Sequence, residues 1–90
     1  MVNDVMARID YLKVVDRLNA TLPHDGDKYA KIYVWHHRYE PKKYGVEVNV
    51  CGKFVDIAVN IPRREVIPNV HKAHRLAVQR MASKSIIHNS

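Results

Sequence analysis

The chain has 90 residues, of which 47% are hydrophobic and 27% are charged, and its formal net charge is +6. This length suits a single domain over residues 1–90 with a modest core, and the composition argues against a disordered chain. One cysteine cannot form an internal disulfide, and no run approaches about 18 apolar residues, so we expect a cytoplasmic protein without a membrane partner.

The first predicted element is a helix over residues 3–22. Asn3 is a good N-cap, and hydrophobic residues recur at helical spacing after it. Among these hydrophobic residues are Leu12, Val15, Leu18 and Leu22. The opposite face mixes both charge signs, which is typical of a helix that packs on a protein core. Pro23 ends the helix, and the Asp-Gly signal after it predicts a turn over residues 24–27.

Residues 28–38 include β-branched and aromatic residues without glycine or proline, which predicts a strand. Alternate residues of a strand point to opposite faces of a sheet. The even series suits the core and consists of Ala30, Ile32 and Val34. The odd series then lies on the outer face and includes Tyr29, Lys31, Tyr33 and Trp35. A loop follows over residues 39–43, because Pro41 cannot join a ladder of strand hydrogen bonds.

Residues 44–61 alternate apolar and polar side chains on both sides of Gly52, which predicts a β-hairpin. The aliphatic series consists of Val46, Val48, Val50, Val55, Ile57, Val59 and Ile61. The second series consists of Glu47, Asn49, Cys51, Phe54, Asp56, Ala58 and Asn60. A lone hairpin cannot cover its own aliphatic face, so other elements must pack on it.

Residues 62–68 lie between two prolines and are predicted to form a basic loop, with Asn69 as the N-cap of a second helix over residues 69–87. The side of this helix that suits the core consists of Val70, Ala73, Leu76, Ala77 and Met81. Its outward side is basic. The whole order predicts an α+β domain of α-β-β-β-α topology, in which two helices pack on one face of a three-stranded antiparallel sheet.

This order of elements, together with two short strings, resembles the double-stranded RNA-binding domain family. The strings are VEVNVCGK at residues 46–53 and AHRLAVQRMA at residues 73–82, which are similar to the family's valine-rich second strand and alanine-patterned last helix. The resemblance implies binding to duplex RNA. The chain departs from the family pattern at residues 68–72, which replace a Gly-x-Gly-x-Ser-Lys-Lys segment, and at residues 40–43, which replace Gly-Pro-x-His.

The basic residues favour nucleic acid as the partner, and RNA over DNA. Two loops and the start of the second helix can meet in one surface that contacts phosphates through charge and helix-end amides. That surface consists of Arg38, Lys42, Lys43, Arg63, Arg64, His71, Lys72, His74 and Arg75. The alternative is a solvated basic surface that keeps a small protein soluble.

The outer face of the first strand is a second candidate site, formed by Tyr29, Lys31, Tyr33 and Trp35. Exposed aromatic residues on a sheet can stack single-stranded bases, bind another protein or a second subunit, or pack within the monomer. A protein partner would make the chain a binding module, such as a phage or mobile-element inhibitor of a host nucleic-acid-processing protein. Clustered cations favour nucleic acid, whereas dispersed cations and an exposed aromatic patch favour a protein partner or a homodimer.

Catalysis and metal binding have little support in the sequence. It contains no catalytic motif and no glycine-rich phosphate-binding loop. His71 and His74 are three residues apart on the predicted helix, but a zinc site needs three or four ligands, and no further ligand lies at a useful spacing. We therefore expect a binding domain that is not an enzyme and uses no metal or cofactor.

Overall fold

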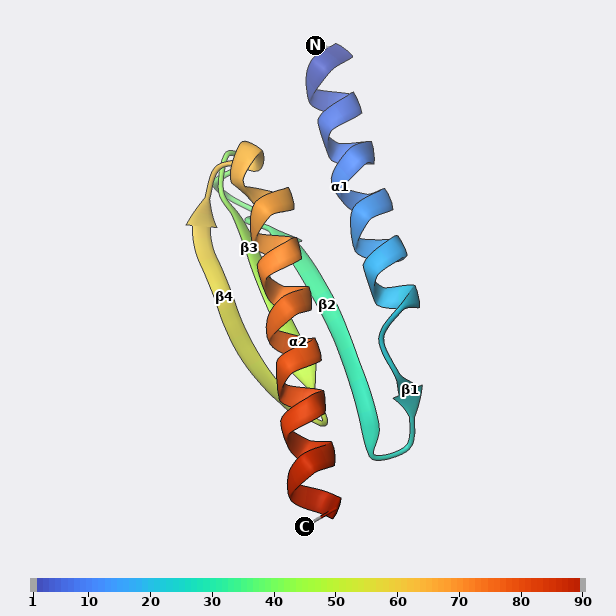
Figure 1. Ribbon diagram of the computed structural model, residues 1–90. Helices are drawn as coiled ribbons and strands as arrows, with labels where there is room; N and C mark the ends of the chain where they lie inside the picture. Colours follow the sequence, from blue (N-terminus) through green and yellow to red (C-terminus); the bar gives the residue numbers. More distant parts are fainter. Residues whose placement is uncertain (1, 90) are drawn as a thin grey trace.

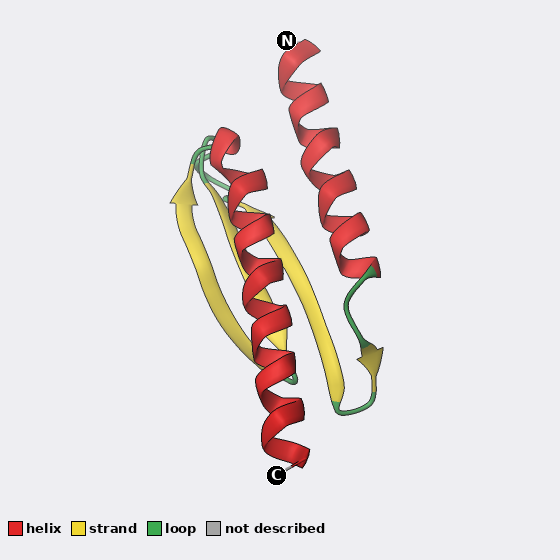
Figure 2. Ribbon diagram, viewed as in Figure 1, coloured by secondary structure: helices red, strands yellow, loops and turns green. Residues whose placement is uncertain are grey.

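The computed structural model describes residues 2–89 of the chain, with side chains described for residues 11–83. Its elements are α1 (Val2–Ala20), β1 (His24–Asp25), β2 (Lys28–His36), β3 (Tyr44–Val50), β4 (Lys53–Ile61), the 3₁₀ helix η1 (Arg63–Glu65) and α2 (Val66–Asn89). The strands form one antiparallel sheet in the order β1-β2-β3-β4, and both helices lie on the same face of it (Figure 1, Figure 2). The predicted α+β class is confirmed, with four strands in place of the predicted three.

The additional strand, β1, has only two residues. His24 pairs with Tyr29, and Asp25 pairs with Lys28, so the predicted Asp-Gly turn closes a short hairpin. Gly26 occupies the turn with a positive φ of 50°, a conformation that glycine adopts without steric cost. Two residues carry no readable alternation, which is why the sequence predicted a turn here and no strand.

The side chain of Asn19 in α1 forms hydrogen bonds with the backbone of β2 at Ile32. Its Oδ1 accepts the backbone N–H of Ile32 at 2.7 Å, and its Nδ2 donates to the carbonyl of Ile32 at 3.0 Å. One amide therefore satisfies the two backbone groups of one residue, as a neighbouring strand would. This pair of hydrogen bonds fixes the end of α1 against the sheet.

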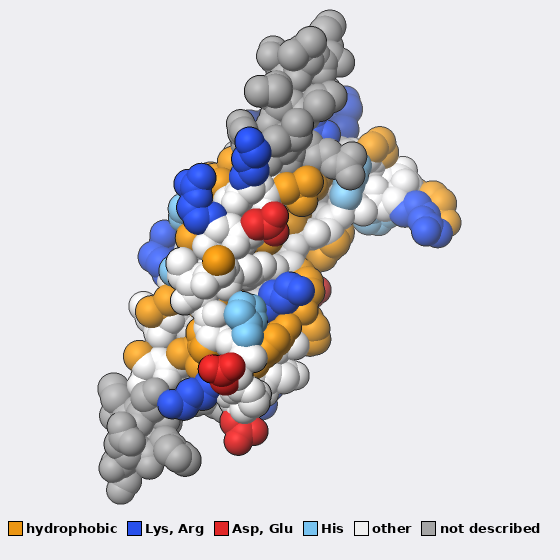
Figure 3. All heavy atoms as spheres, turned by 90° about the vertical axis from the view of Figure 1, so that its right-hand side faces the viewer, with side chains coloured by type: hydrophobic (Ala, Val, Ile, Leu, Met, Phe, Trp, Pro, Cys, Tyr) orange, Lys and Arg blue, Asp and Glu red, His pale blue; other side chains and the backbone are white. Residues whose placement is uncertain are grey.

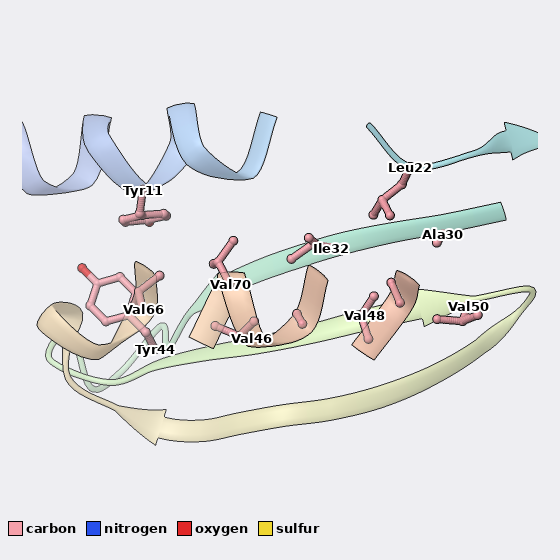
Figure 4. Close-up of a cluster of buried hydrophobic side chains, with 12 residues drawn as sticks. Tyr11, Leu22, Ala30, Ile32, Tyr44, Val46, Val48, Val50, Val66 and Val70 are labelled. Carbon is pink, nitrogen blue, oxygen red and sulfur yellow. The ribbon is translucent and has the colours of Figure 1, made fainter. Parts of the chain in front are cut away.

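The core lies between the sheet and the helices (Figure 4). Its buried residues are Tyr11, Leu22, Ala30, Ile32, Tyr44, Val46, Val48, Val50, Val66, Val70, Ala73 and Ala77. The predicted core faces of β2, β3 and α2 are confirmed. Ala73 and Ala77 are fully buried and small, so the axis of α2 can lie close to the strands beneath it.

The prediction for α1 was wrong at one position, because Tyr11 lies in the core in place of Leu12. Tyr11 is 6% exposed and its ring meets that of Tyr44 edge to face, with 5.9 Å between the ring centroids. Leu12, predicted to be buried, is 45% exposed. Neighbouring residues of a helix differ by about 100° in direction, so this offset turns Leu12 away from the sheet. Asn3, the predicted N-cap, lies outside the residues whose side chains are described.

The regular alternation predicted for β4 was also wrong. Val48 pairs with Val55, but Val46 pairs with Ala58 and Tyr44 with Ile61, so the register shifts twice along the strand. Each shift adds one residue to β4, and Asn60 takes a positive φ of 56° there. Ala58 is consequently half-buried on the core side, and Val59, predicted to be buried, is 51% exposed.

The helix α2 begins at Val66, three residues before the predicted N-cap Asn69. Residues 63–65 form η1 and lead directly into it, so the predicted basic loop is largely helical. Pro68 is tolerated because it falls in the first turn, where a backbone N–H has no partner within the helix. Asn69 instead donates its side-chain amide to the carbonyl of Glu65 at 2.8 Å.

Candidate nucleic-acid interface

The loop between β2 and β3 and the segment after β4 meet at one end of the sheet, and Tyr44 joins them. Tyr44 is 1% exposed, lies opposite Ile61 in the sheet, and accepts a hydrogen bond on its hydroxyl from Nε of Arg63 at 2.8 Å. The ring of His36 stacks on Tyr44 with 4.3 Å between the centroids. The loop over residues 37–43 and η1 are therefore held beside each other.

The loop itself is closed by its own hydrogen bonds. The N–H of His37 donates to the carbonyl of Lys43 at 2.9 Å, and the N–H of Lys43 donates to the carbonyl of Glu40 at 2.9 Å. Nδ1 of His37 accepts the N–H groups of Tyr39 and Glu40, so its ring proton is on Nε2. His36 contacts the carbonyl of Pro41 through Nε2. These bonds shape the loop so that its tip points outward, with Tyr39 81% exposed.

Five of the predicted cations lie at this end, and two of them have structural roles. Nζ of Lys43 is 3.2 Å from Oε1 of Glu40, and the half-buried Arg63 is bonded to Tyr44. Arg38, Lys42 and Arg64 are exposed and form no ion pair with any side chain among residues 11–83. These three are available to an anion.

Arg64 also begins a row of cations that continues along α2. Because η1 runs into α2, Arg64, Lys72 and Arg75 recur at spacings of eight and three residues, which places them on one side of the helix. His71 lies beside them, and all four side chains are exposed. We call these four residues the basic row. From Arg64 to Arg75 it extends about 16 Å, at 1.5 Å per residue.

No acid opposes the basic row within α2. Residues 66–89 contain no Asp or Glu, and the nearest acid in the chain is Glu65 in η1. Arg80 is a further exposed cation of α2 that the predicted site omitted. The absence of acids along this helix is readable in the sequence, and it is a signal that could have led to the inclusion of Arg80.

The structure separates His74 from the other predicted residues. Nε2 of His74 lies 2.8 Å from Oγ1 of Thr21, and that hydroxyl donates its hydrogen to the carbonyl of Leu18 at 2.7 Å. The hydroxyl therefore accepts from His74, whose Nε2 carries a proton. This bond joins α2 to the end of α1, so His74 takes part in helix packing.

The predicted cations that remain available form two groups, the basic row on η1 and α2 and the pair Arg38 and Lys42 on the loop. Figure 3 views the molecule from the side of α1 and shows Lys and Arg side chains in several places, with uncharged and acidic surface between them. Helix-end amides contribute little, because the N–H of Val66 donates to the carbonyl of Arg63 and Pro68 has no N–H. Phosphate contacts would depend on side-chain charge.

The second candidate site lies on the face of the sheet opposite the helices. Tyr29, Lys31, Tyr33 and Trp35 are all half-buried there, as the odd series of β2 predicted. The hydroxyls of Tyr29 and Tyr33 are 3.3 Å apart. This hydrogen bond, and then burial, raise the pKa of Tyr33. Phe54 of β4 adds a ring that the predicted site omitted, 5.8 Å from the ring of Tyr33.

Among the described residues, no three His, Cys, Asp or Glu side chains are placed to hold a metal ion. Cys51 is a half-buried free thiol, and its Sγ lies 3.8 Å from Sδ of Met81. Neither helix, over the residues described, is long and apolar enough to cross a membrane.

Comparison with protein-family models, curated proteins and solved structures gives no match for this chain.

Proposed function

We propose that this chain is a nucleic-acid-binding domain that contacts phosphates through the basic row, and that it prefers RNA duplexes to DNA. The observation that supports the proposal is the exposed row that begins at Arg64 in η1 and continues through Lys72 and Arg75 on α2, a helix without acids. Such a row attracts phosphates along its length, and binding releases the counterions that surround them.

Support for RNA comes from the arrangement of the elements and from the resemblance in the strings VEVNVCGK and AHRLAVQRMA. A-form duplexes are recognised by shape, phosphate and 2′-hydroxyl contacts, so a rigid basic row needs no base-reading side chains. The exposed cations of the loop, Arg38 and Lys42, are a second contact region. Tyr39 lies between them in the chain and is exposed at the loop tip.

A fluorescence titration with duplex RNA, duplex DNA and single strands, at two salt concentrations, tests this proposal. We expect the double variant Lys72→Glu and Arg75→Glu to lose about tenfold or more in affinity for duplex RNA. We also expect its salt dependence to fall by about two phosphate contacts. Both residues are exposed, so the variant should keep the far-UV circular dichroism of the parent.

The matched control is Lys13→Glu with Arg17→Glu, which makes the same change in net charge at two exposed positions of α1. An equal loss of affinity in the control would mean that net charge alone attracts the RNA. Unchanged affinity in the folded Lys72 and Arg75 variant would show that the basic row is not the site. A third variant, Arg38→Glu with Lys42→Glu, reports whether the loop binds the same duplex.

The protein-binding alternative would leave the basic row as a solubilising surface. It predicts weak binding that does not distinguish RNA from DNA or duplex from single strand. That result would turn attention to the aromatic face of the sheet.

A further inference from the structure

On the face of the sheet that the helices leave uncovered, the side chains of three strands line up in rows. Strand pairing places Tyr33, Glu47 and Asp56 in one row across β2, β3 and β4. The adjacent row consists of Lys31, Asn49 and Phe54. Neither α1 nor α2 covers these two rows, because both helices lie on the other face (Figure 2). We call these six residues the open block.

Aromatic rings supply apolar surface in the open block and beside it. The rings of Tyr33 and Phe54 are 5.8 Å apart, and Phe54 is 59% exposed. The indole of Trp35 covers Gly45, its partner in the sheet, since a Cβ added to Gly45 would be 2.0 Å from the ring. Aromatic surface of this kind on a sheet is typical of a face that binds another macromolecule.

The three charged residues of the open block form no ion pair with one another or with any other side chain that the structure describes. Glu47 and Asp56 lie directly opposite each other, which is unfavourable for two carboxylates. Neither forms an ion pair with a side chain among residues 11–83. Lys31 likewise has no carboxylate partner there, and its Nζ lies 5.3 Å from the centre of the Tyr33 ring. Two acids on this face argue against a phosphate backbone as the ligand.

The positions of these charges make the face complementary to itself. Lys31 on β2 and Asp56 on β4 lie at diagonally opposite corners of the open block. A two-fold axis between two facing sheets, at right angles to that diagonal, places Lys31 of each copy over Asp56 of the other. The second diagonal, from Tyr33 to Phe54, then runs near the axis, so the rings of the two copies meet at the centre.

We propose that this chain forms a homodimer in which the open blocks of two copies pack face to face. The pairs Lys31 to Asp56, made twice across the interface, bring one cation of the partner copy to Asp56, at the position beside Glu47. Burial of Phe54 and the neighbouring rings supplies the apolar centre. The basic row of each copy stays exposed on the far side, so this inference does not depend on the proposed function.

Sedimentation equilibrium of the full chain at about 1 to 100 μM measures the dimer directly. We expect the wild type to dimerise, and Asp56→Lys or Lys31→Asp to weaken dimerisation about tenfold or more. The swapped double variant, Lys31→Asp with Asp56→Lys, restores the pair with its charges exchanged and should recover most of the affinity. Asp16→Lys makes the same charge change at an exposed position of α1 and should have no effect.

Asp56→Lys removes the repulsion with Glu47, so the monomer should remain folded, as circular dichroism will show. A monomeric wild type at about 100 μM would overturn the proposal. So would a single reversal that dimerises as well as the wild type, or a swapped variant that stays as weak as the single ones. The last result would indicate that the face binds a different protein or that the reversals act through net charge.

Discussion

The two faces of the sheet are formed by alternate residues of the same strands, yet they differ in how completely the fold uses them. On the helix side, Ile32, Val46 and Val48 are at most 1% exposed and belong to the buried hydrophobic cluster. On the open side, the residues next to them in sequence include Lys31, Tyr33 and Glu47, and Phe54 of β4 is more than half exposed. The side chains of the first face are buried within one chain, whereas those of the second face remain partly exposed.

This difference separates what holds the domain together from what is available for binding. Burial of aliphatic surface drives folding and has no need of a partner outside the chain. The open face retains exposed rings, whose burial by a partner would be favourable, and two carboxylates without an ion pair among residues 11–83, for which a partner would have to supply a cation. The basic row on α2 is a third surface, and it faces away from both.

The largest expected effect is a loss of stability on truncation of a buried valine, compared with the same truncation of an exposed valine. Val48→Ala removes two carbon atoms from a fully buried site and should lower the free energy of unfolding by about 2.5 kcal/mol. Val59→Ala, in the same hairpin, should cost less than about 0.5 kcal/mol because that side chain is exposed. Urea unfolding of the two variants measures the difference.

Equal costs at the two positions would contradict the register shifts in β4 and support the uninterrupted alternation that the sequence suggests. Phe54→Ala sharpens the comparison, since it removes a larger side chain from the open face of the same strand. Its cost to the monomer should remain below that of Val48→Ala.

The sequence predicted the elements of this fold better than their details. The alternation in residues 30–34 and 46–50 identified the core face, because β2 and β3 pair in an unbroken register. In β4 the same rule failed, since periodicity counts residues and has no information on where an extra residue enters a strand. The start of α2 was missed because Pro68 reads as a helix boundary, although the first turn of a helix accepts proline.

Prediction of the site was limited by contacts between residues distant in sequence. The exposed cations on α2 follow from helical spacing, so Lys72 and Arg75 could be identified from the sequence. The roles of Arg63 and His74 could not, because Tyr44 and Thr21 lie 19 and 53 residues away from them. Opposition of Glu47 and Asp56 likewise depends on the register of the hairpin, which the shifts in β4 determine.

A smaller loss of stability is expected for a substitution at Gly45, which lies in β3 beneath the ring of Trp35. A Cβ at this position would collide with the ring of Trp35, so Gly45→Ala should displace the indole from the sheet. We expect a loss of about 1.5 kcal/mol in the free energy of unfolding and a red shift of the tryptophan fluorescence. In a Trp35→Val background the same substitution should cost much less, and a cost that stays unchanged would mean that the ring does not need the glycine.

The smallest expected effect is at Tyr33, whose pKa is raised above 10.0, first by its hydrogen bond with Tyr29 and then by burial. In the unfolded chain the phenol ionises near pH 10. Just above that pH the folded state holds more protons than the unfolded state, so stability falls as the pH rises toward the folded pKa. Below pH 10 both states are protonated, and this contribution to stability is fully present.

Tyr33→Phe removes this titration and keeps the ring that meets Phe54. The fall in the free energy of unfolding between about pH 9 and pH 11 should therefore be smaller in the variant than in the wild type. Identical profiles for Tyr33→Phe and the wild type would mean that the hydrogen bond between Tyr29 and Tyr33 does not raise the pKa of Tyr33. The open face would then lack the ordered pair of phenols that distinguishes it from an ordinary solvated sheet.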